Sequence, residues 1–315
     1  MQHTLFQRYR HFITLLIFTL FFVACSPNDP SETSSRLYIR LTNAVVGGVD
    51  SDTIIVPITN LFIDIQSIEL FSVDTDTGDS EEQTIFLGRE YDVLHLSNGR
   101  LQQISALWYS ASRTIAEIRL VLGNNSHIRN VANQIFPLAV PDEIIVKNID
   151  TYIPLNTINS IIIELNSTLF HNAADSTFSL EFMPRGFSEA YGSSLRGSVT
   201  PREAQALIVI SNEYNMIPLR SFADDQTGNF NFLGISPGRW EVNIYTPRES
   251  GFRDTTFFHT VRDDERVSNL GTIPLRANTV SPDPDPDPDP DPDPDPDPDP
   301  DPEEEYDDEE YDDEE

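Results

Sequence analysis

Few side chains in this chain have the type and spacing that chemistry requires. Cys25 is the only cysteine among 315 residues, which excludes an internal disulfide and a zinc site built on thiolates. Four histidines follow residue 24, and no two of them have the spacing of metal ligands on one helix; they are His95, His127, His171 and His259. The segment 192–197 lacks the order of a nucleophile elbow, and no glycine-rich phosphate loop is present. These patterns predict a non-catalytic protein that needs no cofactor.

The chemistry expected of Cys25 is acylation. Basic residues at 8–11 precede an apolar run over 12–23, which is too short to span a bilayer and is typical of a secretory signal. Ala24 is a small residue directly before the cysteine, and residues 22–25 resemble the bacterial lipobox, with Phe22 where Leu is commoner. We therefore predict a lipoprotein signal peptide over 1–24 and a lipid on Cys25. The alternative is an ordinary signal peptide followed by an incidental cysteine.

The lipid would attach the mature chain to a membrane. Each buried methylene of an acyl chain adds about 0.8 kcal/mol of membrane affinity, so several chains hold the protein firmly. Residues 25–35 are polar and contain two prolines, as expected of a tether. By resemblance to bacterial lipoproteins, Ser26 implies sorting to the outer membrane. The sequence does not decide whether the protein lies on the periplasmic or the external face of that membrane.

A second candidate for chemistry is the acidic segment that contains Asp74, Asp76 and Asp79, because clustered carboxylates are the ligands that calcium prefers. Counted from Asp74, however, Gly78 occupies the fifth loop position rather than the sixth, and Ile85 stands where a bidentate Glu is required. We therefore favour a solvated hairpin tip over a calcium loop, and we assign no metal site.

Charge is unevenly distributed. The net charge is −32, but 21 acidic and no basic residues lie in 281–315, so the remainder carries −11. No cluster of Lys and Arg suited to phosphates is apparent, and nucleic acid is not expected as a partner. The tail consists of ten Asp-Pro repeats and a Glu-, Asp- and Tyr-rich end, a composition that predicts a stiff, disordered segment. It is interpreted either as a solvated spacer, which we favour, or as an arm that binds basic proteins or divalent cations.

The region between tether and tail predicts an all-β protein with two antiparallel β-sandwiches in series. Short runs with a period of two are separated by turn residues, and amphipathic runs of helical length are missing. Strands are expected near 36–41, 61–71, 84–87, 115–122, 144–149, 158–165 and 177–182. The break at 192–194 divides a first domain, 36–190, from a second, 193–276.

The first domain resembles a bacterial family known as domain of unknown function 4382. The resemblance rests on five segments, 41–44, 91–99, 117–122, 137–141 and 161–166. The sequence departs from the pattern at Asn43 and Val45, where the family favours Asp and Pro, and at Glu164 and Asn166, where it favours Asp-Phe-Asp. The lost carboxylates weaken any metal site that the resemblance could imply, and the family has no assigned activity.

The second domain contains the most specific pattern of the body, over 225–244. Gly228 permits a tight turn, Phe230 and Phe232 face one way on the next strand, and Pro237-Gly238 leads into a strand with Trp240 toward the core. We interpret these two strands as a hairpin. The segment, together with 270–275, resembles the carboxypeptidase regulatory-like module, a transthyretin-like β-sandwich, which implies a spacer, stalk unit or binding platform. A sugar-stacking role for these aromatic residues is the less favoured alternative to a core role.

Taken together, these features predict a non-catalytic, lipid-anchored protein of the bacterial cell envelope that acts in adhesion, ligand capture or envelope architecture. An alternative is an accessory carbohydrate- or calcium-binding lipoprotein that serves a transporter or an enzyme. A third is an enzyme whose site is assembled from distant residues without a motif. An exposed row of aromatic residues on the first domain would favour the accessory role.

Overall fold

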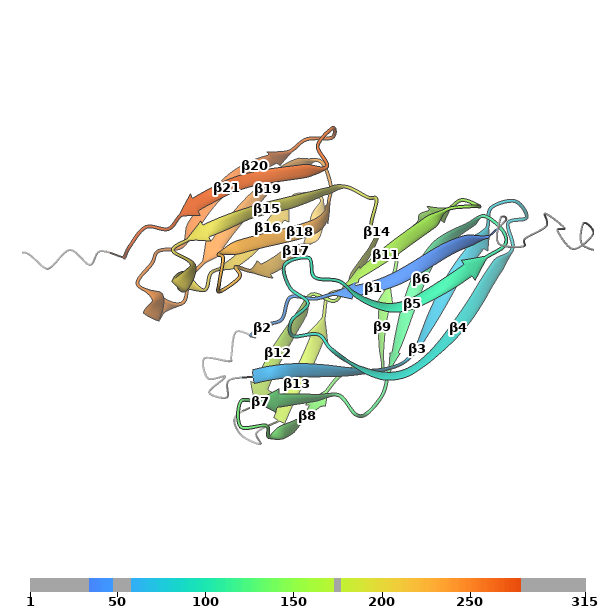
Figure 1. The fold of residues 1–315 in the computed structure, drawn as a ribbon, viewed down its shortest axis with the longest axis horizontal. Helices are drawn as coiled ribbons and strands as arrows, with labels where there is room; N and C mark the ends of the chain where they lie inside the picture. Colours follow the sequence, from blue (N-terminus) through green and yellow to red (C-terminus); the bar gives the residue numbers. More distant parts are fainter. Residues whose placement is uncertain (1–33, 48–57, 173–176, 279–315) are drawn as a thin grey trace, which may run out of the picture. The chain divides into compact units, whose positions relative to one another are not determined.

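The computed structural model describes residues 34–47, 58–172 and 177–278, in which β-strands are the dominant element (Figure 1). The all-β prediction is therefore confirmed. The contacts place Met1–Ala277 in one unit and Asn278–Glu315 in another, and every strand belongs to the first. No helix within the described ranges is long and apolar enough to cross a membrane. The predicted signal peptide, Cys25 and the acidic tail lie outside the described residues.

The first sandwich contains a four-stranded sheet in the order β14-β11-β1-β5. Its strands are β1 (Ser35–Thr42), β5 (Gln102–Tyr109), β11 (Ile158–Glu164) and β14 (Arg185–Ser188). β1 pairs with β5 in the antiparallel sense and with β11 in the parallel sense. Alternation along β1 directs Leu37, Ile39 and Leu41 into the core at 0% exposure.

A larger sheet packs against this one. Its path is β10-β6-β3-β7-β8-β13-β12-β2, with β4 added to β3 and β9 added to β6. The strands are β2 (Val46–Gly47), β3 (Ile58–Asp74), β4 (Ser80–Asp92), β6 (Arg113–Leu122), β7 (His127–Asn130), β8 (Ile135–Ala139), β9 (Glu143–Val146), β10 (Thr151–Ile153), β12 (Ser167–Asn172) and β13 (Thr177–Phe182). The long hairpin predicted around the acidic segment is β3 and β4.

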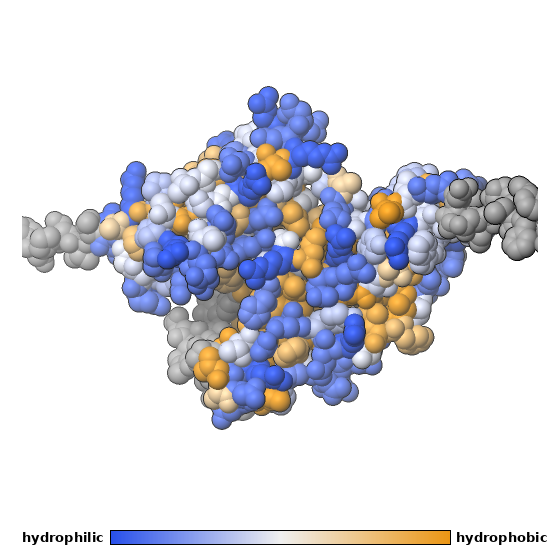
Figure 2. Space-filling model, in the orientation of Figure 1, coloured by the Kyte–Doolittle hydropathy of each residue, from blue (hydrophilic) through white to orange (hydrophobic). Residues whose placement is uncertain are grey.

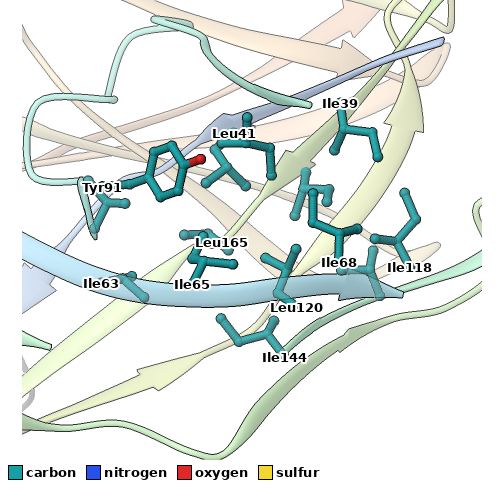
Figure 3. Close-up of a cluster of buried hydrophobic side chains, with 14 of the residues drawn as sticks. Ile39, Leu41, Ile63, Ile65, Ile68, Tyr91, Ile118, Leu120, Ile144 and Leu165 are labelled. Carbon is teal, nitrogen blue, oxygen red and sulfur yellow. The ribbon is translucent and has the colours of Figure 1, made fainter. Parts of the chain in front are cut away.

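Aliphatic side chains from both sheets fill the space between them (Figure 3). Ile39 and Leu41 of one sheet lie in the same cluster as Ile65, Ile68 and Leu120 of the other, all at 0% exposure. Each side chain of this kind stabilises the fold by about 1.5–3 kcal/mol relative to exposure to water. The period of two in the sequence thus reflects this buried layer.

The second sandwich has a separate core. One sheet has the order β18-β15-β21 and the other β17-β16-β19-β20. The strands are β15 (Ser193–Thr200), β16 (Leu207–Asn212), β17 (Asn215–Phe222), β18 (Asn229–Ile235), β19 (Gly238–Tyr245), β20 (Thr255–Val261) and β21 (Val267–Pro274), with short 3-10 turns η2 (Arg202–Ala204) and η3 (Arg248–Ser250). Phe230, Phe232 and Trp240 are at most 2% exposed, so their predicted core role is confirmed.

The predicted hairpin between β18 and β19 is wrong. β18 pairs with β15, whereas β19 pairs with β16 and β20, so the Pro237-Gly238 turn carries the chain from one sheet to the other. Both strands alternate in the same way because Phe230 and Trp240 lie in one core between the sheets. A turn signal between two alternating runs does not distinguish a hairpin from such an arch.

Four strand pairs are parallel, namely β1 with β11, β2 with β12, β8 with β13 and β15 with β21. The remaining pairs are antiparallel, as predicted. Parallel partners need a long connection, and in β1 and β11 more than a hundred residues intervene. Alternation gives the face of each residue but not the identity of the neighbouring strand.

Trp240→Ala is expected to lower the free energy of unfolding by about 3–5 kcal/mol, because it opens a cavity in the second core. It also removes the hydrogen bond from the indole Nε1 to the carbonyl of Ser236, 3.0 Å away. Urea unfolding followed by circular dichroism measures the change. Tyr245→Ala, on the same strand at 45% exposure, is the control and should change stability by less than about 1 kcal/mol. Equal losses for both variants would contradict this assignment of the core.

Tyr109→Phe should reduce the loss of stability in alkali. Burial raises the pKa of Tyr109 to about 12 from 10.0, and the hydroxyl has no hydrogen-bond partner within the described residues. The folded state therefore holds this proton more tightly than the unfolded chain, so its contribution is complete below pH 10 and is lost as the pH rises toward 12. The difference between wild type and variant should reach about 2–3 kcal/mol in this interval, measured by urea unfolding at stepped pH. The same dependence of the free energy of unfolding on pH in both proteins would contradict this prediction.

Candidate functional site

The acidic segment predicted as a hairpin tip lies at the turn between β3 and β4. Asp74 Oδ1 accepts hydrogen bonds from the backbone N–H groups of Asp76, at 2.9 Å, and Thr77, at 3.0 Å. These two bonds lower the pKa of Asp74. The N–H of Asp79 donates to the Thr77 hydroxyl. Within the described residues no group of three or more His, Cys, Asp or Glu side chains is suited to a metal ion.

The four histidines lie in separate structural contacts. His127 stacks on Phe62, with ring centroids 4.8 Å apart, and His171 packs on Phe178 at 4.7 Å. His259 Nε2 lies 2.8 Å from the hydroxyl of Ser268. His95 lies 3.5 Å from the carboxylate of Asp92 and is otherwise exposed. In these contacts each ring has a packing or hydrogen-bonding role.

A serine motif that the sequence analysis missed occurs at Gly234–Gly238, where the order is Gly-x-Ser-x-Gly around Ser236. A nucleophile elbow places this serine between a strand and a helix. Here β18 precedes it and β19 follows it, and the carbonyl of Ser236 accepts the Trp240 indole bond. The motif therefore forms the arch between two sheets rather than a nucleophile elbow.

Three positions at which the sequence departs from the resembled family, Asn43, Glu164 and Asn166, lie close together at the ends of β1 and β11, where Thr42 pairs with Glu164. Asn43 is 1% exposed, and its Oδ1 accepts bonds from the N–H and hydroxyl of Ser167. Asn166 is also 1% exposed. The sequence places two amides and one carboxylate here, and protein groups occupy all three.

Two arginines bind this cluster and link it to the second sandwich. Arg185 Nε lies 2.5 Å from Glu164 Oε2, while its two terminal nitrogens donate to the carbonyls of Leu233 and Gly234. Arg220 donates to the side chain and carbonyl of Asn166. Burial lowers the pKa of Arg220, and the nearby Glu164 raises it. The two guanidinium groups thus bind the one carboxylate and one of the two amides of this cluster.

Beside this cluster lies a cavity of about 670 Å³, here called the tyrosine groove. It is lined by 148–152, by 185–188, by Ala190 and Tyr191, and by Gly234 and Ser236. Tyr152 is 54% exposed and Tyr191 is 53% exposed. Its volume lies within the range of small-ligand sites, about 300–1,000 Å³. Neither Tyr152 nor Tyr191 was identified from the sequence, because an isolated tyrosine in a turn or short strand carries no pattern.

The polar side chains of the tyrosine groove are available to a ligand. Asn148 and Asp150 are exposed, and their side chains make no hydrogen bond within the described part of the chain. Both residues have left-handed backbones, with φ of 57° and 42°. Such conformations cost energy in non-glycine residues and are enriched at functional sites. By contrast, the guanidinium of Arg185 is engaged by Glu164 and two carbonyls.

A second cavity, of about 610 Å³, is lined mainly by polar residues of β15, β18 and β21 and is here called the polar groove. Some of its side chains bind one another: Ser198 with Thr272 at 3.0 Å, Thr227 with Asp224 at 2.9 Å, and Arg100 with Asp224 at 3.6 Å. Phe230 in its lining is 1% exposed. It therefore offers no exposed aromatic ring.

The outer face of the sheet that contains β1 carries a row of arginines and aromatic rings. Arg36 lies 4.4 Å from the centroid of Trp108 and 5.2 Å from that of Tyr38. Arg40 follows, 5.7 Å from Tyr38, and forms an ion pair with Glu189 at 2.9 Å. Trp108 remains 59% exposed. Figure 2 shows that hydrophobic residues on the viewed face form separate patches among hydrophilic ones.

Comparisons with known proteins leave the chain without a family. No protein-family model and no curated protein matches it. Among solved structures, the shaft pilin SpaA of Lactobacillus rhamnosus GG is 9% identical, with a TM-score of 0.23 over 79% of this chain and 99% of that one. The major pilin subunit BcpA of Bacillus cereus is also 9% identical, with a TM-score of 0.23 over 77% of this chain and 99% of that one. The Bacillus anthracis TIE protein is 9% identical with a TM-score of 0.21, and this chain covers 34% of its length. At these values the likeness assigns neither family nor function.

Arg185→Ala should lower the free energy of unfolding by about 3–5 kcal/mol, because Glu164, with a side chain 11% exposed, loses its partner. The control is Arg262→Ala, in an ion pair whose side chains are 72% and 78% exposed, where the change should stay below about 1 kcal/mol. Urea unfolding of both variants measures the difference. The prediction fails if the two variants lose similar amounts.

Proposed function

We propose that the protein is a non-catalytic, lipid-anchored protein of the bacterial cell envelope that captures an extracytoplasmic ligand. Lipidation of Cys25 would attach the protein to a membrane, and the sorting predicted from Ser26 would direct it to the outer membrane. The β-sandwiches present the binding surface. Among the roles considered from the sequence, ligand capture is the one that the described residues support best.

The observation that carries the proposal is the tyrosine groove. Two half-exposed tyrosines and two unpaired polar side chains line one cavity, an arrangement typical of ligand sites. Among the other candidate groups for chemistry, the described histidines pack on rings or pair with neighbours, and Asp74 closes a turn. Binding is therefore better supported than catalysis.

The accessory role in carbohydrate binding is favoured by one specific observation. Exposed aromatic residues occur on the first sandwich at Trp108 and Tyr152, and Tyr191 lies in the turn directly after its last strand, β14. Aromatic rings with one apolar face and a polar edge suit ligands that combine C–H and hydroxyl groups. The calcium-binding version of this role has no comparable support within the described residues.

Cys25→Ser should move the protein from the membrane fraction to the soluble fraction, because the serine hydroxyl is not a substrate for thiol acylation. Fractionation of cells, with immunodetection of the body, measures the change. Ser31→Ala, in the same tether, is the matched control and should stay with the membrane. A Cys25→Ser protein that remains membrane-bound would overturn the lipid anchor. Protease treatment of intact cells then tests its face: release of the body places it outside.

A further inference from the structure

The lining of the tyrosine groove identifies a class of ligand. From Tyr152, Tyr191, Asn148 and Asp150, we propose that this groove binds a neutral saccharide chain. The inference rests on the proposed function, because it names the ligand captured by the same site.

The two tyrosines supply the apolar part of the site. Tyr152 lies on β10, a strand of three residues that ends its sheet, and Tyr191 lies in the turn after β14. Both rings are about half-exposed and line one cavity. A pyranose ring presents C–H groups on its faces and hydroxyls at its rim, and tyrosine offers an apolar ring with a polar tip. Stacking on such rings supplies affinity without a charge on the ligand.

Asn148 and Asp150 supply the directional contacts. An amide provides both donors and acceptors, and a carboxylate provides acceptors, so together they match the hydroxyl groups of a sugar, which donate and accept. Neither side chain has a partner within the described residues. Thr151, directly after Asp150, is 7% exposed, and its hydroxyl donates to the carbonyl of Ile149. This bond and the buried Ile149 hold the segment on the core.

Charge decides between a neutral and an anionic ligand. The one basic side chain in the lining is Arg185, whose charge is paired with Glu164 and whose terminal nitrogens donate to the carbonyls of Leu233 and Gly234. Asp150 adds a negative charge at the rim. A phosphate or uronate would therefore meet an unpaired carboxylate and no free cation, which is unfavourable. A neutral saccharide meets neither difficulty.

Packing keeps the tyrosine groove in shape. A Cβ on Gly186 would lie 2.8 Å from Val146 and 2.9 Å from Ile149, and a Cβ on Gly234 would overlap the ring of Phe187. The main chain of β14 thus lies directly on the core, and Gly234 lies directly on Phe187. Tyr191 is held by a turn in which its N–H donates to the carbonyl of Ser188. The site is largely preformed, which limits the entropy lost on binding.

Affinity electrophoresis tests the proposal with the full-length, detergent-solubilised protein. The probes are neutral polysaccharides cast in native gels, namely hydroxyethyl cellulose, β-glucan, xylan, glucomannan and pullulan, and two anionic ones, alginate and polygalacturonate. At least one neutral polymer should retard the protein. Tyr152→Ala and Tyr191→Ala should each weaken that retardation and raise the apparent dissociation constant at least tenfold.

Tyr214→Ala is the matched control, because Tyr214 is 81% exposed in the turn between β16 and β17, away from the lining of the tyrosine groove. It should bind like wild type. Circular dichroism and thermal unfolding of all three variants show whether the fold is kept. Retardation by no neutral polymer, by the anionic polymers only, or to the same extent in all variants overturns the saccharide assignment. Such a result leaves the lipid anchor standing, since fractionation of Cys25→Ser tests that part separately.

Discussion

The contacts of Arg185 are the interaction on which the rest of the described structure depends most. A single guanidinium binds a carboxylate of the first sandwich and two carbonyls of the second. Burial of Glu164 makes this costly unless every partner is present, because a buried charge without a partner destabilises a protein by several kcal/mol. The arrangement therefore specifies one placement of β14 against β18. The tyrosine groove takes lining residues from both sides of that contact.

Much of the fold follows from alternation in the sequence, because a residue pattern of period two reflects burial on one face. The strands around 36–41 and 115–122 and the core role of Trp240 were predicted for this reason. Pairing partners were not, since alternation is the same whether a strand turns back on its neighbour or crosses to another sheet. The arch between β18 and β19 shows this difference, and so does the parallel pairing of β1 with β11.

The candidate site was far less predictable. Tyr152 and Tyr191 are 39 positions apart and belong to no motif; they share a cavity only because the fold brings β10 and the turn after β14 together. In the sequence, Asn148 and Asp150 do not differ from other polar loop residues. The structure adds their left-handed backbones and unpaired side chains. By contrast, Asp74, in the acidic segment that the sequence made a candidate, uses its carboxylate to close a turn. Residue type alone does not separate a free carboxylate from one that the backbone already uses.

Charge connects the groove with the rest of the chain. With a net charge of −32, of which −11 belongs to residues before 281, the protein does not attract polyanions at long range. Screening limits such an interaction to about 8 Å at physiological ionic strength. A neutral ligand carries no net charge, so the charge of the protein does not change its rate of association. Stacking of a saccharide on two tyrosines would give modest affinity for one copy. A lipid anchor on every copy would concentrate many grooves on one membrane, and a saccharide chain with repeated units could then engage several of them at once, so that avidity compensates for weak single contacts.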